Sequence, residues 1–140
     1  MDRPVEEAAA LLNDGTLSVA QLHGHEDGDY IRALRAAAPG HPVWKAFKVR
    51  GPTDLEAANA SPADLVILDN GYGTGETFDW SLAGGVARPF LLAGGLTPEN
   101  IPDAIRLLHP WGLDISSGVE TDRKKDLTKI HAAVAAARKD

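Results

Sequence analysis

The feature that most constrains the fold is a regular alternation of short apolar segments with segments of helical periodicity. A first helical segment is expected at residues 5–13, and five strand-type segments are expected at 17–22, 43–49, 65–69, 90–93 and 112–115. Further helical segments are expected at 29–38, 53–60, 98–108 and 126–138, with a short helical start at 79–82. Strands separated by helices imply parallel pairing with right-handed crossovers, so the sequence predicts an α/β fold.

The repeating pattern runs through the whole chain of 140 residues without a linker, so we expect a single domain over residues 1–140. Each repeat takes about 20 to 25 residues, the size of one β/α unit. Two architectures fit this pattern: an open, doubly wound sheet and a piece of a β/α barrel. In both, the loops that follow the carboxyl ends of the strands build the functional site.

Two strand–loop units in the second half of the chain end in glycine. Residues 91–100 read Leu-Leu-Ala-Gly-Gly-Leu-Thr-Pro-Glu-Asn, and residues 112–120 read Gly-Leu-Asp-Ile-Ser-Ser-Gly-Val-Glu. Glycine lets the backbone approach a ligand closely, and the Thr-Pro pair predicts a helix start, which favours negative charge. The pattern predicts an anion site for a phosphate group. Paired phosphate loops on the last two strands favour the barrel.

Other polar side chains stand at or near the predicted strand ends. Asp69 follows an apolar strand, where it can act as a general acid or cap the next turn. His23 can contact a substrate or have a structural role. Lys45 can face a polar cavity, join an ion pair or extend to solvent. Asp114 should point away from its two apolar neighbours, into a salt bridge or toward a substrate.

Composition restricts the partners and the chemistry. The formal net charge of −6 argues against nucleic acid or an anionic membrane as the main partner. No apolar run is long enough to span a bilayer, and the first residues do not resemble a signal peptide, so we expect a cytoplasmic protein. The sequence has no cysteine for a disulfide, metal ligand or nucleophile. His23 and His25 lack a convincing set of further ligands, so no metal is expected.

Six segments together resemble phosphoribosylanthranilate isomerase, in the order of that family and over essentially the whole chain. They read Gln-Leu-His-Gly at 21–24, Lys-Ala-Phe at 45–47, Leu-Asp at 68–69, Gly-Thr-Gly-Glu-Thr-Phe-Asp-Trp-Ser at 73–81, Ala-Gly-Gly-Leu-Thr-Pro-Glu-Asn at 93–100 and Asp-Ile-Ser-Ser-Gly-Val-Glu at 114–120. The resemblance implies a (β/α)8 TIM barrel. It also implies an Amadori rearrangement in tryptophan biosynthesis, an aldose–ketose isomerisation that needs no metal or organic cofactor.

In that reaction, N-(5-phosphoribosyl)anthranilate becomes 1-(2-carboxyphenylamino)-1-deoxyribulose 5-phosphate, so the expected partner is a small phosphorylated substrate. By resemblance, Asp69 matches the general acid that protonates the furanose ring oxygen and opens the ring. His23 and Asp114 match positions near the substrate. The residues that match the phosphate loops are Gly94, Gly95, Ser117 and Gly118. Family members often have lysine where this sequence has Glu76.

The resemblance starts just after the third strand of the family fold, at its third helix. It therefore implies a partial barrel of five parallel strands, whereas a closed barrel of this type has eight. The exposed edges of such a piece recruit other strands, so we expect a homo-oligomer or completion by the missing N-terminal strands. A monomeric alternative is an open sheet covered by rearranged helices.

The family's general base is a cysteine near the end of the first strand, and this sequence contains no cysteine. We therefore expect weak or absent activity from this chain alone. His23 and Lys45 are the residues considered as substitute bases, but the resemblance gives both of them other roles. One alternative is a non-catalytic phosphate-binding or self-assembling barrel fragment. Another is a barrel isomerase for a different phosphoribosyl aminoaldose, such as one of histidine biosynthesis, against which the segment at 73–81 argues.

Overall fold

The computed structural model describes residues 1–69 and 79–139, and its main feature is a five-stranded sheet in the sequential order β1-β2-β3-β4-β5. All four neighbouring pairs are parallel. The strands are β1 (Ala20–Leu22), β2 (Val43–Lys48), β3 (Leu65–Asp69), β4 (Phe90–Ala93) and β5 (Gly112–Asp114). The predicted α/β fold with a parallel sheet is confirmed.

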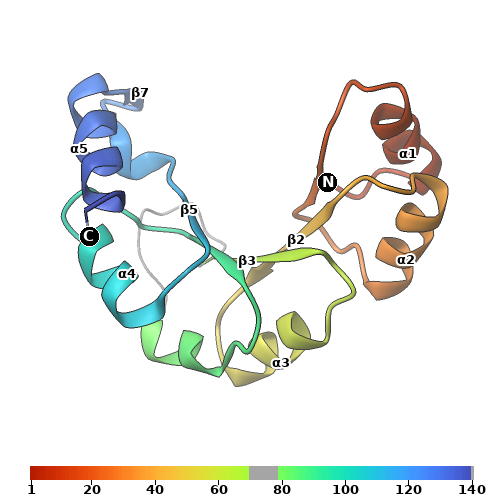
Figure 1. Ribbon diagram of the computed structural model, residues 1–140, viewed down its shortest axis with the longest axis horizontal. Helices are drawn as coiled ribbons and strands as arrows, with labels where there is room; N and C mark the ends of the chain where they lie inside the picture. Colours follow the sequence, from red (N-terminus) through yellow and green to blue (C-terminus); the bar gives the residue numbers. More distant parts are fainter. Residues whose placement is uncertain (70–78, 140) are drawn as a thin grey trace.

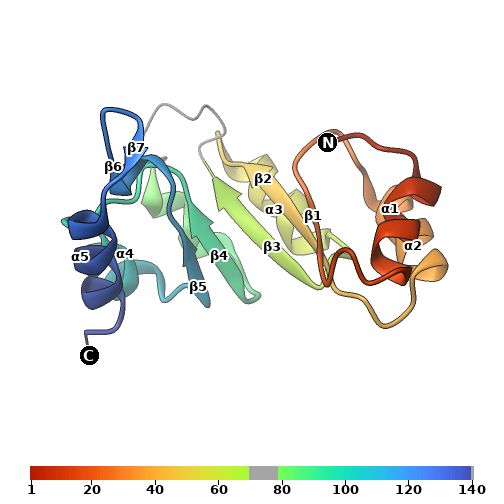
Figure 2. The same ribbon diagram turned by 90° about the horizontal axis from the view of Figure 1, so that it is seen from above.

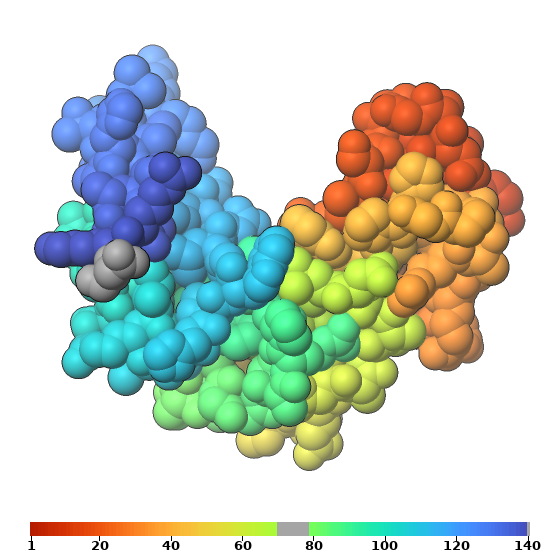
Figure 3. Space-filling view, in the orientation of Figure 1, coloured from red at the N-terminus to blue at the C-terminus, as the bar shows by residue number. Residues whose placement is uncertain are grey.

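The sheet is curved, and its helices lie on the convex side (Figure 1). The α-helices are α1 (Val5–Asn13), α2 (Gly28–Ala37), α3 (Pro52–Ala60), α4 (Ile101–Leu108) and α5 (Leu127–Ala137). Two short 3-10 helices are η1 (Trp80–Gly85) and η2 (Ser117–Val119). Figure 2 shows the strands side by side, and Figure 3 shows that the concave side is hollowed between the first and last parts of the chain.

Two of the α-helices, α2 and α5, start where an aspartate side chain satisfies free backbone N–H groups. The Asp27 carboxylate accepts a hydrogen bond from the N–H of Tyr30 at the start of α2. The Asp126 carboxylate accepts from the N–H groups of Thr128 and Lys129 at the start of α5. These local signals explain why the observed starts of α2 and α5 lie within one residue of the predicted ones.

The predicted boundaries were wrong at two places that matter for the site. The strand expected from residue 17 begins at Ala20, because the N–H of Leu17 bonds to Leu11 O (2.8 Å) and residue 17 still belongs to the turn after α1. The helix expected from residue 98 begins at Ile101. A hydrogen-bonded turn between Thr97 and Asn100 takes the place of its first turn.

A small antiparallel hairpin follows η2 and was not predicted. It consists of β6 (Glu120–Thr121) and β7 (Lys124–Lys125). Its two turn residues, Asp122 and Arg123, have φ values of 52° and 61°, the left-handed backbone of tight hairpin turns. Asp-Arg is not a typical sequence for such a turn, and the strands have two residues each, so periodicity gave no signal.

Successive side chains of the central strands point alternately into a core beneath the helices and into a smaller cluster on the concave face. The helix-facing residues Val66, Leu68 and Leu92 are fully buried and pack in one core with residues of α3 and α4. The opposite, concave face carries a smaller cluster of Leu65, Ile67, Leu91 and Ala93, against which Trp44 and Ala46 pack. A third cluster joins α1 and α2 to the N-terminal strands; it includes Leu12, Ile31, Leu34 and Val43.

Candidate functional site

A row of side chains crosses the concave face at the carboxyl ends of the strands. The Cα atoms of Lys48 and Asp69 are register partners, and so are those of Ala93 and Asp114. Leu68 pairs with Leu92, so Asp69 lies beside Ala93. Asp69 and Asp114 therefore stand two strands apart, roughly 10 Å along the sheet. The structure places the predicted acid and one predicted substrate contact in the same row.

Asp69 occupies the position that its strand pattern predicts. It is half-buried at the end of β3, and it alternates with Leu65 and Ile67 of the concave cluster. Its backbone carbonyl accepts a hydrogen bond from the N–H of Val49 (2.8 Å), which fixes the strand end against β2. The turn that Asp69 was alternatively expected to cap, and the Glu76 position, lie outside the described residues.

The two glycine loops meet directly. A Cβ atom on Gly118 would lie 1.6 Å from the backbone carbonyl oxygen of Leu96, so no side chain fits at this position unless the backbone moves. Gly94 and Gly95 have φ values of 84° and 67°, in the left-handed region that favours glycine. The loop after β4 and the segment after β5 are therefore packed against one another through positions that require glycine.

Hydrogen bonds hold the first of these loops in place. The Asn100 amide donates to the Gly95 carbonyl (2.9 Å), and its oxygen accepts from the N–H of Thr97 (2.8 Å). Within residues 1–69 and 79–139, the backbone N–H groups of Gly94, Gly95 and Gly118 donate to no protein acceptor. Unpaired N–H groups on adjacent loops are suited to bind an anion.

The segment after β5 is also held in place by hydrogen bonds from lysine side chains of the hairpin and of α5. The Lys125 ammonium donates to the Ser116 carbonyl (3.0 Å) and to the Glu120 carboxylate (2.7 Å). Lys129 of α5 donates to the Glu120 carbonyl (2.6 Å). The side chain of Lys125 therefore supports the loop that contains Ser117 and Gly118.

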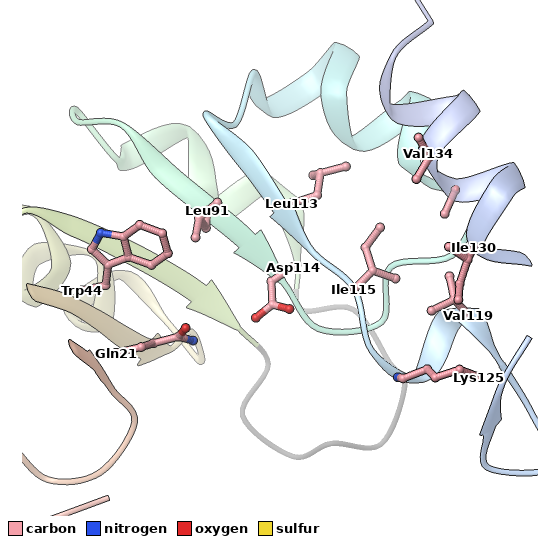
Figure 4. A pocket seen from close by; sticks show the side chains of 11 residues that line it. Gln21, Trp44, Leu91, Leu113, Asp114, Ile115, Val119, Lys125, Ile130 and Val134 are labelled. Carbon is pink, nitrogen blue, oxygen red and sulfur yellow. The ribbon is translucent and has the colours of Figure 1, made fainter. Parts of the chain in front are cut away.

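The other predicted substrate contacts reach the concave side from the two ends of the sheet. Figure 4 shows that Asp114 and Leu113 leave β5 on opposite sides, as the alternation predicted. Asp114 is exposed and has no ion pair among the described residues, so the expectation that it could join a buried salt bridge was wrong. His23 is exposed just after β1 and lines a hollow with Lys48, four strands away from Asp114.

Lys45 points to the helix-covered side, where it forms a buried ion pair. Its ammonium lies 3.1 Å from the Glu26 carboxylate and donates to the Gly24 carbonyl (2.7 Å). Glu26 also accepts from the N–H groups of Gly24 and Asp2 (2.7 Å each). Burial opposes ionisation, but the backbone N–H of Asp2, a further backbone N–H and Lys45 together lower the pKa of Glu26 to about 2.

A groove of about 770 Å³ runs along the concave face (Figure 4). Gln21, Trp44 and Leu91 line it from the strands, and Ile130 and Val134 line it from α5. Trp44 packs against the concave cluster and stands on the wall of this groove. The alternation within β2 could have shown this, because Trp44 is out of phase with the buried Val43 and Lys45.

Two features of the described residues bear on ligands and membranes. No group of three or more His, Asp or Glu side chains in that part of the chain is arranged to hold a metal ion. Among the helices of residues 1–69 and 79–139, none is both long enough and apolar enough to cross a membrane.

Comparison with known proteins connects this geometry with one family. A family model described as N-(5'phosphoribosyl)anthranilate (PRA) isomerase matches residues 1–136. The N-(5'-phosphoribosyl)anthranilate isomerase of Thermoanaerobacter sp. (strain X514) is 36% identical over 141 residues, an alignment that covers 96% of this chain and 68% of the relative.

Solved structures give the same result. The phosphoribosyl anthranilate isomerase of Thermus thermophilus superimposes with a TM-score of 0.81 at 36% identity, over 96% of this chain and 68% of that one. A phosphoribosyl anthranilate isomerase in complex with reduced 1-(o-carboxyphenylamino)-1-deoxyribulose 5-phosphate gives a TM-score of 0.78 at 32% identity, over 98% of this chain and 68% of that one.

Proposed function

Because the chain belongs to the N-(5'-phosphoribosyl)anthranilate isomerase family, we propose that its site at the carboxyl ends of the strands serves the isomerisation of N-(5-phosphoribosyl)anthranilate in tryptophan biosynthesis. One observation carries the proposal: the contact of Gly118 with the Leu96 carbonyl joins two glycine loops beside the row that contains Asp69. This arrangement offers a phosphate site and a carboxyl group on the same side of one sheet.

In this proposal, Gly94, Gly95, Ser117 and Gly118 hold the substrate phosphate through backbone N–H groups. Asp69 donates a proton to the furanose ring oxygen while the bond between that oxygen and C1 breaks. The lone pair of the amine nitrogen forms the C=N bond, so the ring opens to an iminium. Removal of the proton on C2 then gives an enamine, which converts to the ketone of the product.

The second proton transfer needs a base, and the family's cysteine is absent from this sequence. Lys45 does not fit that role, because its ammonium is buried in an ion pair on the helix-covered side. Unlike Lys45, two other polar side chains are on the substrate side of the sheet: His23 is exposed there, and Asp114 lines the groove. A missing base costs about two to four powers of ten in rate, so we expect weak or absent turnover from this chain alone.

We also propose that residues 1–140 form a single domain, a partial β/α barrel that starts at the third helix of the family fold. Within the described residues, β1 and β5 each pair with one neighbour, and the groove would be the interior of the completed barrel. The missing surface would come from further N-terminal strands or from a second copy of the chain.

Charge supports a head-to-tail contact between copies. Residues 1–38 carry seven acidic and three basic side chains, whereas residues 120–139 carry three acidic and six basic ones. The two ends of the sheet therefore have opposite charge and would attract each other in trans. Light scattering at micromolar concentration should show an oligomer, and a strictly monomeric species would contradict self-association.

The phosphate site is tested by Gly118→Ala. The new Cβ would collide with the Leu96 carbonyl and separate the two loops, so affinity for reduced 1-(o-carboxyphenylamino)-1-deoxyribulose 5-phosphate should fall at least about tenfold. The matched control is Gly84→Ala, because a Cβ at that position meets no atom within 4 Å. Titrations followed by NMR measure both affinities, and equal affinity of the two variants would contradict the loop assignment.

The acid is tested by Asp69→Asn. Loss of fluorescence of phosphoribosylanthranilate measures turnover, and any activity of the chain should drop by about two to four powers of ten in the variant while ligand binding persists. Turnover that survives the substitution would remove Asp69 from the mechanism. Binding without turnover in the unmodified chain would instead support the alternative proposal of a non-catalytic phosphate-binding module, which the absence of cysteine favours.

A further inference from the structure

Asp114 is a carboxylate on the substrate side of the sheet that no contact in the described part of the chain explains. It is the exposed last residue of β5, and its side chain points into the groove (Figure 4). Within residues 1–69 and 79–139, its carboxylate forms no hydrogen bond or ion pair. Lys125 lines the same groove, but its ammonium is bonded to Ser116 and Glu120 instead. The Asp114 carboxylate is therefore free to accept a proton from a ligand.

The row that contains Asp114 leaves a gap between two carboxyl groups. Asp69, Ala93 and Asp114 are neighbours across β3, β4 and β5, and all three lie on the concave face. The side chain between the two aspartates is only a methyl group, and the aspartate Cα atoms are roughly 10 Å apart. Pairs of carboxyl groups that act together on a sugar stand about 5 to 10 Å apart. A furanose ring therefore fits above Ala93 with one carboxyl group on each side.

The proposed acid decides which edge of the sugar ring faces Asp114. In a furanose ring, the bond between C2 and C3 lies opposite the ring oxygen. When the ring oxygen is directed to Asp69, the C2–C3 edge is directed across Ala93 to Asp114. C2 is the carbon that must lose a proton after the ring opens, so Asp114 stands at the edge where a base is needed.

His23, the other free polar side chain named above, occupies a different position. It follows β1, and β2 with the side chain of Lys48 lies between it and Asp69. Asp114 precedes Ser117 of the proposed phosphate site by only three residues. A sugar held through its phosphate therefore lies beside Asp114 and on the far side of Asp69 from His23.

We propose that Asp114 is the base that removes the proton from C2 in this cysteine-free chain. The electron pair of the C2–H bond forms the C1=C2 double bond, and the π electrons of the iminium return to nitrogen, which gives the enamine. Asp114 then returns the proton to C1, while the hydroxyl on C2 gives its proton to Asp69 and becomes the ketone. Both aspartates are restored, and no further reactant is consumed. This role rests on the proposed function, because Asp69 and the phosphate loops set the position of the ring.

The experiment separates proton transfer from binding. Loss of fluorescence of phosphoribosylanthranilate measures turnover by the full chain and by Asp114→Asn, which keeps the shape of the side chain but removes the basic oxygen. NMR titration with reduced 1-(o-carboxyphenylamino)-1-deoxyribulose 5-phosphate measures the affinity of each protein. Asp114→Ala is assayed with and without formate, a small carboxylate that can enter the space left by the side chain. Asp103→Asn, at an exposed position of α4, is the control for the same loss of charge.

We expect turnover by Asp114→Asn to fall by about two to four powers of ten, while its affinity for the ligand stays within about threefold of that of the unmodified chain. Formate should restore part of the turnover of Asp114→Ala, and Asp103→Asn should match the unmodified chain. Turnover that survives Asp114→Asn, or an equal loss of turnover and affinity, would overturn the base while leaving the proposed function intact. Absence of turnover by the unmodified chain would overturn the proposed isomerisation, and the base with it.

Discussion

The two faces of the sheet were built from neighbouring residues of the same strands, yet they have opposite properties. On the convex face, Leu68 and Leu92 are completely buried beneath the helices. On the concave face, Leu91 and Trp44 line an open groove, and Asp69, Asp114 and other polar groups follow at its end. The convex face therefore holds the β/α units together, while the concave face remains available for ligand and for further strands.

Lys45 and Lys48 allow the two faces to be compared within one strand. The largest change in the free energy of unfolding is expected for this pair. Lys45→Met should lower the free energy of unfolding by about 3–5 kcal/mol, because it leaves the Glu26 carboxylate buried without its partner. Lys48→Met should change it by less than about 0.5 kcal/mol, since its side chain is exposed. Urea unfolding measures both values. Similar losses of unfolding free energy for the two variants would contradict the difference between the two faces.

Adjacent leucines of β4 test the apolar part of the comparison. Leu92→Ala should cost about 3 kcal/mol, because it leaves a cavity between the sheet and the helices. Leu91→Ala removes the same atoms from the wall of the groove, where solvent can fill the space, and should cost about 1–2 kcal/mol. The same urea experiment gives the difference, and a larger loss for Leu91→Ala would reverse our view of which face stabilises the fold.

Lowering the pH should reduce the stability of the fold, because the Glu26 carboxylate on the helix-covered side becomes protonated. The pKa of this carboxyl is about 2 in the fold, against 4.5 as the ordinary value. Since the folded pKa is the lower one, its contribution is fully present above pH 4.5 and is lost as the pH falls toward 2. The loss should reach at most about 3 kcal/mol.

Glu26→Gln is the control for this titration. Its unfolding free energy, measured from pH 6 down to pH 3, should depend less on pH than that of the unmodified protein, although the variant itself is less stable. An identical pH dependence of the two proteins would show that other carboxyl groups are responsible.

The sequence carried enough information for the order of the elements, the parallel sheet and the glycine loops, because these depend on local periodicity and on turn residues. It could not show the contact of Gly118 with the Leu96 carbonyl, which exists only when two separate loops pack together. The role of Lys45 was left open for a similar reason: alternation assigns a side chain to a face, but its partner Glu26 lies 19 residues earlier in a loop. The start of α4 could not be predicted either, because it depends on a short turn in which the Asn100 side chain accepts a hydrogen bond from the N–H of Thr97.

The sequential order of the strands has a consequence for biosynthesis. In the described five-stranded sheet, each strand after β1 pairs with the strand made just before it, so its partner is already present when it emerges. Contacts between consecutive units need only short loops to close, which favours rapid folding. The polypeptide can therefore add one β/α unit after another as it leaves the ribosome, and the last units to emerge are those that bring the two glycine loops together.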